Sequence, residues 1–184
     1  MTWYEFLLFV HIAAAALWLG GGLFLQIYAI SVRRGGDPVE MGQFAARVGR
    51  LGDRVFIPAS VTVILAGIGL TIEGSWSWGT FWIVFALAAF AGSFLTGALV
   101  IGPTAKKIGA VGAESAEGQE LVRRIFIVSR VDLAFMYAIL FAMAVKPTGD
   151  DGLMIALGAI VLAALTVIFL APLRRPKAPA AATD

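Results

Sequence analysis

Long apolar stretches alternate with short polar segments along the whole chain. Each stretch is long enough to cross roughly 30 Å of hydrocarbon as a helix, and none alternates apolar and polar residues as a membrane barrel strand does. The pattern predicts an all-α, polytopic membrane helix bundle with five transmembrane helices in one domain, residues 1–172. The predicted spans are residues 6–30, 56–72, 81–101, 125–145 and 153–170.

Basic residues predict the orientation of this bundle. All of the 14 Lys and Arg residues except Lys146 lie in segments 33–54 and 104–130 or in the tail, 173–184. Because Lys and Arg are retained at the cytoplasmic ends of spans, we expect cytoplasmic loops at 33–54 and 104–124. The N-terminus is then outside and the C-terminus in the cytoplasm, where the Pro- and Ala-rich tail is predicted to be disordered.

The first predicted loop carries a helix-start signal. Asp37 has the character of an N-cap, and Pro38 suits the first helical position. Apolar residues from Met41 to Leu51 then recur at helical spacing, opposite several arginines. This segment predicts a short helix lying on the anionic inner leaflet of the membrane.

Composition narrows the range of functions. The chain is 60% hydrophobic with a mean hydropathy of +0.89, which is typical of a membrane protein. The absence of cysteine excludes disulfides, thiolate nucleophiles and Cys-ligated iron–sulfur clusters. No phosphate loop, nucleophile elbow or pair of catalytic carboxylates is present, so no enzyme class is indicated. The expected partner is the lipid bilayer of the cell (inner) membrane, joined by a second copy or other membrane proteins, and nucleic acid is not expected.

His11 is the single histidine, and it falls inside the first predicted span. It shares one stripe of that helix with Trp18 and Gly22. A neutral imidazole can ligate haem iron or copper, relay protons, or make one interhelical hydrogen bond, and the residues leave these alternatives open. If His11 binds haem or a metal ion, a second ligand is needed. The candidates are Met136 and Met143, which the fourth span brings to a similar depth, Lys146, and His11 of a second chain.

Two further ionisable residues, Arg130 and Asp132, fall in the fourth span. They lie about 200° apart around the helix, so each needs a different neighbour. Five polar residues have a depth comparable to that of Asp132 and predict a buried polar layer with it: Gln26, Tyr28, Ser60, Thr62 and Thr96. This layer either holds helices together by hydrogen bonds or forms a proton or ion pathway.

The first span also carries a family resemblance. The pattern His11-x6-Trp18-x-Gly20-Gly21-Gly22 is similar to the start of a bacterial family of predicted integral membrane proteins of unknown function. Weaker likeness extends over about residues 5–147. The residues that carry this weaker likeness are Pro58, Gly67 and Gly69 in span two, Gly102-Pro103 after span three and the run from Met143 to Pro147.

More distantly, the His-x6-Trp opening resembles HemJ-type protoporphyrinogen oxidases and CopD-type copper-resistance proteins. The HemJ likeness implies that His11 binds haem, with haem b as the cofactor. Span two has no lysine to match the membrane lysine that HemJ-type proteins require. The resemblance therefore implies cofactor binding without naming a reaction.

Three functions follow from these patterns. The first is a membrane protein that binds haem b through His11. The second is a non-catalytic scaffold or accessory subunit that assembles through small-residue helix faces such as Ala89, Ser93 and Gly97. The third is a proton- or ion-coupled transporter that uses Asp132.

Overall fold

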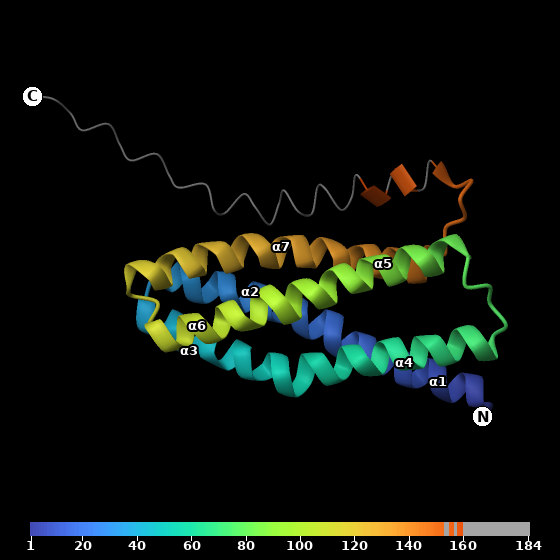
Figure 1. The fold of residues 1–184 in the computed structure, drawn as a ribbon, viewed down its shortest axis with the longest axis horizontal. Coiled ribbons are helices and arrows are strands. Elements are labelled where there is room, and N and C mark those ends of the chain that lie inside the picture. Colours follow the sequence, from blue (N-terminus) through green and yellow to red (C-terminus); the bar gives the residue numbers. More distant parts are fainter. Residues whose placement is uncertain (153–154, 157, 160–184) are drawn as a thin grey trace, which may run out of the picture.

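The described part of the chain contains four long helices, and each runs antiparallel to the one before it, as the computed structural model shows (Figure 1). The structure describes residues 1–152, 155–156 and 158–159. These residues contain helices, turns and connecting segments, and no strand. The all-α prediction is thus confirmed for the described residues. The fifth predicted span, 153–170, and the tail, 173–184, lie almost entirely outside them.

Each of the first three long helices contains one π-helical turn, in which the backbone hydrogen bonds skip one extra residue. The fourth long helix is α-helical throughout. The elements are α1 (Trp3–Ala15), η1 (Ala16–Gly20), α2 (Gly21–Gly35); α3 (Pro38–Leu51), η2 (Gly52–Phe56), α4 (Ile57–Glu73); α5 (Phe81–Thr96), η3 (Gly97–Ile101), α6 (Gly102–Val111); and α7 (Ala116–Val145).

Two of the π-turns have a clear cause in the sequence. Pro58 follows η2 and Pro103 follows η3, and a proline has no N–H to donate to the carbonyl four residues earlier. Its ring also clashes with that carbonyl, and a π-turn just before the proline relieves the clash without ending the helix. The turn η1 has no proline after it; it ends at Gly20, and Gly21 and Gly22 follow.

The helices extend further than the sequence pattern predicts. Residues 33–54, expected as a loop, are almost wholly helical, because α3 continues through η2 into α4. Likewise, α6 reaches Val111 and α7 starts at Ala116, where the Ser115 side chain accepts a hydrogen bond from the Gly118 N–H. Only short connections therefore remain at this end of the bundle, which we call the basic end because most Lys and Arg residues lie there.

The helix predicted to start at Asp37 is present, but the position expected for it is wrong. Asp37 accepts a hydrogen bond from the Val39 N–H and Pro38 begins the helix, as the sequence indicates. Its apolar side, including the buried Met41 and Ala45, packs against other helices of the bundle rather than against the membrane surface. The α3–α6 contact is close because both faces carry small residues.

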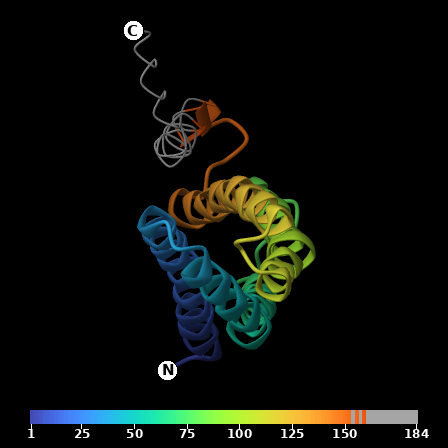
Figure 2. The same ribbon diagram turned by 90° about the vertical axis from the view of Figure 1, so that its left-hand side faces the viewer.

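Viewed along the axis of the bundle, the four long helices of the described residues form a ring in which each neighbours the next (Figure 2). Away from the basic end, α1 packs against α4 and α5 against α7; at the basic end, α3 packs against α6. Two separate hydrophobic clusters form the core, one around Trp18 and Met136 and one around Met41 and Phe126. Phe9 and Leu99 are among many large apolar side chains that remain exposed, as expected for a surface that faces lipid.

The opposite end of the bundle is closed by aromatic residues and one lysine. Lys146 ends α7 in a left-handed conformation, with φ of 50°. Its ammonium lies 5.3 Å from the ring centroids of both Trp76 and Trp82. Cation–π attraction to two rings therefore ties the end of α7 to the connection between α4 and α5.

The α3–α6 contact gives the first prediction. A Cβ at Gly109 would lie 2.8 Å from the Cβ and 3.2 Å from the Cα of Ala46, so backbone has to move to admit it. We expect Gly109→Ala to lower the free energy of unfolding by about 1–3 kcal/mol, the usual cost of overpacking. Thermal unfolding in detergent, followed by circular dichroism, measures the effect.

Gly20→Ala is the matched control, because a Cβ at Gly20 meets nothing within 4 Å and its backbone is already right-handed helical. This control should be neutral or slightly stabilising. Equal losses of stability in the two variants would contradict a close α3–α6 approach.

Candidate functional site

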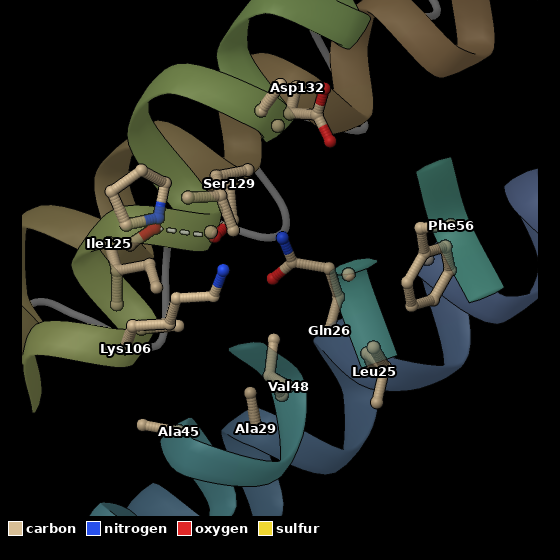
Figure 3. Close-up of a pocket in the computed structure, with 18 of the residues that line it drawn as sticks. Leu25, Gln26, Ala29, Ala45, Val48, Phe56, Lys106, Ile125, Ser129 and Asp132 are labelled. Carbon is tan, nitrogen blue, oxygen red and sulfur yellow. Dashed lines mark hydrogen bonds between the residues drawn. The ribbon is translucent and has the colours of Figure 1, made fainter. Parts of the chain in front are cut away.

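A cavity of about 210 Å³ lies inside the bundle between the two core clusters (Figure 3). Trp18 and Met136 of the first cluster line one side of it. Met41 and Phe126 of the second cluster line the side toward the basic end. The cavity is therefore placed where the packing of the bundle changes from the α1–α4 and α5–α7 pairs to the α3–α6 pair.

All three π-turns contribute to the cavity wall. Trp18 comes from η1, Asp53 and Phe56 from η2, and Gly97 and Ile101 from η3. A π-turn widens the helix locally and shifts the side chains that follow it, and such turns are frequent at functional sites. Three helices thus depart from regular α geometry around one space.

A few polar side chains line this largely apolar space (Figure 3). The central one is Asp132 on α7, which is only 8% exposed. Its Oδ1 accepts a hydrogen bond of 2.6 Å from the Ser93 hydroxyl on α5. Ser60 and Ser129 instead donate to carbonyls of their own helices, those of Ile57 and Ile125. The Asp132 carboxyl group is therefore held at the cavity wall by one hydrogen bond between α7 and α5.

An ion pair lies at the edge of the cavity toward the basic end. Lys106 on α6 places its Nζ 2.6 Å from Oδ2 of Asp53 on η2, and both side chains are about half exposed. The Lys106 stem packs over Gly49, where a Cβ would lie 2.9 Å from its Cγ. The pair connects the second and third long helices at the cavity wall, which both residues line.

The structure brings together only part of the predicted polar layer. Gln26 and Asp132 line the same cavity. Thr62 and Thr96 donate to the carbonyls of Pro58 and Gly92 on their own helices and do not line it. Arg130 is buried but does not line the cavity either.

The sequence reasoning missed the main partner of Asp132. The sequence pattern places Ser93 on a small-residue packing face, together with Ala89 and Gly97, and gives its hydroxyl no role. The signal was present, because Ser93 is a polar residue at a depth similar to that of Thr96 on the same helix. Lys106 and Asp53 were also missed, because segments 33–54 and 104–124 were expected to lie outside the bundle.

His11 lies in the α1–α4 contact, away from the cavity. Its Nδ1 is 2.9 Å from the Val63 carbonyl oxygen. Because a carbonyl only accepts, Nδ1 carries the proton of the ring and Nε2 keeps its lone pair. Gly67 makes this approach feasible, since a Cβ there would lie 3.2 Å from the His11 Cε1.

The other proposed haem-binding residues lie elsewhere. Trp18 is 5% exposed and packs against Phe90 at 5.2 Å between ring centroids. Met136 approaches Gly22, about 16 Å along the first helix from His11 at 1.5 Å per residue. Met143 is 36% exposed in the last turn of α7, and α7 packs mainly against α5 and α6. The structure thus does not bring Met136 to His11, and no cluster of three or more His, Cys, Asp or Glu occurs in the described residues.

Comparison with known families now places the chain. Residues 5–147 match the DUF2269 family, whose description is "predicted integral membrane protein", and the chain belongs to this family. Searches of the curated proteins and of the solved structures found no match. The chain is therefore an integral membrane protein with several apolar helices, and its lipid surroundings follow from that membership.

The hydrogen bond between Ser93 and Asp132 gives the second prediction. Ser93→Ala and Asp132→Asn should each change the free energy of unfolding, and the double variant should show a coupling energy of about 0.5–3 kcal/mol between them. The physical reason is that Ser93→Ala leaves a buried carboxylate oxygen without its donor. The unsubstituted protein, the two single variants and the double variant are each unfolded by titration with a denaturing detergent in mixed micelles. The four free energies of unfolding give the coupling energy.

Ser60→Ala is the matched control for this cycle. Ser60 and Ser93 are both 2% exposed and both line the cavity, but Ser60 donates within its own helix. Its effect should therefore add to that of Asp132→Asn. Coupling of the same size for Ser60 would mean that the cavity as a whole, and not the hydrogen bond, links the residues.

Proposed function

We propose that this protein binds a small, partly apolar molecule with a cationic group inside its helix bundle. The observation that carries the proposal is the Asp132 carboxylate, held by Ser93 at the wall of an otherwise largely apolar cavity. Binding pockets for small molecules share this composition: apolar walls with a few convergent polar groups. An ionisable residue inside a membrane bundle is costly, and it usually marks a ligand or ion pathway.

The cavity limits the size of the ligand. An apolar cavity of about 150 Å³ accommodates benzene, so about 210 Å³ accommodates a molecule of about eight to ten non-hydrogen atoms. Phe56 and Phe94 supply aromatic walls for the apolar part. Asp132 and the amide of Gln26 supply the groups that orient the polar part.

The ligand is proposed to enter from the cytoplasm. We place the basic end in the cytoplasm and the N-terminus outside, in a bacterial-type cell membrane, because Lys and Arg concentrate at the basic end. The Lys106–Asp53 pair then lies between the cytoplasm and the cavity. An exposed pair of this kind contributes only about 0–1 kcal/mol, so it separates at little cost. This arrangement suits a binding or transport protein better than an enzyme.

Benzylamine and benzyl alcohol test this function. They have nearly the same shape and about eight non-hydrogen atoms each, but only benzylamine is a cation at neutral pH. We expect benzylamine to bind the purified protein, and Asp132→Asn to weaken its binding about 10- to 100-fold, because a charge-assisted hydrogen bond contributes about 1.5–3 kcal/mol. Isothermal titration in detergent measures both affinities.

Asp150→Asn is the matched control, since Asp150 is exposed and lies beyond the end of α7. It should leave the affinity for benzylamine unchanged. Binding of benzyl alcohol should be the same in all three proteins. If Asp132→Asn binds benzylamine as well as the unsubstituted protein does, Asp132 is not the anchor and the proposal fails.

Haem b bound through His11 is the second candidate. One observation favours it: donation of Nδ1–H to the Val63 carbonyl orients the ring and frees Nε2, which is how protein histidines usually hold a metal ion. If Nε2 of His11 holds haem, any further protein ligand would come from a residue outside the α1–α4 contact, such as His11 of a second copy of the chain. A scaffold role through homo-oligomers or other membrane proteins also stays a prediction.

An absorption spectrum separates the haem hypothesis from a packing role. If His11 is a ligand, protein purified with ample haem shows a b-type spectrum, oxidised and reduced, which His11→Ala abolishes. Met136→Leu is the control, because Met136 lies near Gly22 and not near His11. A colourless protein with full helical content would leave His11 as a residue that joins α1 to α4.

A further inference from the structure

Arg130 is a buried cation with an unpartnered nitrogen among the residues that the structure describes. It lies near the middle of α7, where it is 4% exposed. Its Nη1 has no hydrogen-bond partner among the described residues. A buried guanidinium nitrogen that makes no hydrogen bond costs free energy, so a missing acceptor is the simplest explanation for its position.

A second arginine lies next to it. The guanidinium of Arg33, near the end of α2, lies 4.9 Å from the ring centroid of Phe126. Phe126 and Arg130 are four residues apart on α7 and therefore lie on the same face of that helix. Arg33 therefore lies over the same face of α7 that carries Arg130.

Neither arginine has an acidic partner in the part of the chain that the structure describes. The ion pairs found there involve other residues: Glu5, Asp53, Glu117 and Glu120 with their cations. Asp132 is not the acidic partner of either arginine, because it lines the cavity and accepts a hydrogen bond from Ser93. A phosphate has several acceptor oxygens, and guanidinium groups are the donors that match them best, so one phosphate suits two arginines on the same side of α7.

We propose that Arg33 and Arg130 together bind a phosphate group at the seam between α2 and α7. This site is distinct from the cavity, since neither arginine lines it. The bound anion supplies acceptors for the Arg130 guanidinium and a counter-charge for both arginines. The binding of a phosphate here is independent of the function proposed for Asp132.

The depth of the site agrees with the headgroup of a membrane phospholipid. Arg130 lies 15 residues before the end of α7 at Val145, which is about 22 Å at 1.5 Å per residue. In a hydrocarbon layer roughly 30 Å thick, this places it about 8 Å from the boundary at the basic end, within reach of a long side chain. Ile127 and Val131 beside it on α7 are 43% and 51% exposed, and they offer apolar surface to acyl chains.

Titrations of the full chain in dodecyl maltoside with dioleoylphosphatidylglycerol, dioleoylglycerol and inorganic phosphate test the site. Thermal unfolding at increasing ligand gives an apparent affinity for each. We expect the phospholipid to stabilise the protein and dioleoylglycerol, which has the same chains without the phosphate, to have no effect. Arg130→Met and Arg33→Gln should each weaken the phospholipid about tenfold or more.

Two features keep the result interpretable. Arg130→Met should fold, because replacing a buried charge with an apolar side chain of similar length is often neutral or stabilising. Arg34→Gln is the control: Arg34 is exposed and adjacent to Arg33, and its loss should change the affinity by less than about threefold.

Each outcome decides the matter. Stabilisation by the phospholipid alone identifies a headgroup site. Stabilisation by inorganic phosphate as well identifies a site that is also open to soluble phosphate. Either result supports the proposal if Arg130→Met removes the stabilisation. An equal response to dioleoylglycerol, an unchanged response in Arg130→Met, or no response to either phosphate compound overturns it.

Discussion

Hydrocarbon offers no hydrogen bonds, and this constraint explains both the helices and the position of their polar side chains. In a bilayer every backbone N–H and C=O needs a partner in its own segment, so the apolar stretches form continuous helices. The same requirement applies to side chains. Ser60, Thr62, Thr96 and Ser129 donate to carbonyls of their own helices, and Ser93 donates to Asp132. Arg130 differs from them, because its buried Nη1 has no hydrogen-bond partner among the described residues.

Two prolines, one in the second and one in the third long helix, explain why the cavity lies where it does. Pro58 and Pro103 each remove one backbone donor, and a π-turn precedes each of them. The turns place Phe56 and Ile101 at the cavity wall, at the level where the first helix also has its π-turn. The cavity thus lies where regular helix packing is interrupted in three helices, and not at an arbitrary gap between side chains.

The sequence predicts the apolar core of each span well, because that signal is long and uniform. It predicts helix ends poorly where a polar helix continues an apolar one: α3 and α6 carry enough charge to resemble loops, yet both pack inside the bundle. Asp132 and Gln26 could be placed at one depth by counting residues. Their partners could not, since depth does not tell which way a helix faces; Thr62 and Thr96 share that depth and point elsewhere. The π-turns add a further rotation that a fixed 100° per residue does not include.

The fourth long helix separates its two membrane charges by direction. Asp132 faces the cavity and Arg130 faces the seam with α2, and an angle of about 200° between them prevents a direct ion pair on one helix. An internal pair would have neutralised both charges and left neither available to a ligand. Because they are kept apart, each charge needs its own counterpart: a hydroxyl and a cationic ligand for Asp132, and an anion shared with Arg33 for Arg130. One helix thus carries two sites of opposite charge preference, and either can be altered without removing the other.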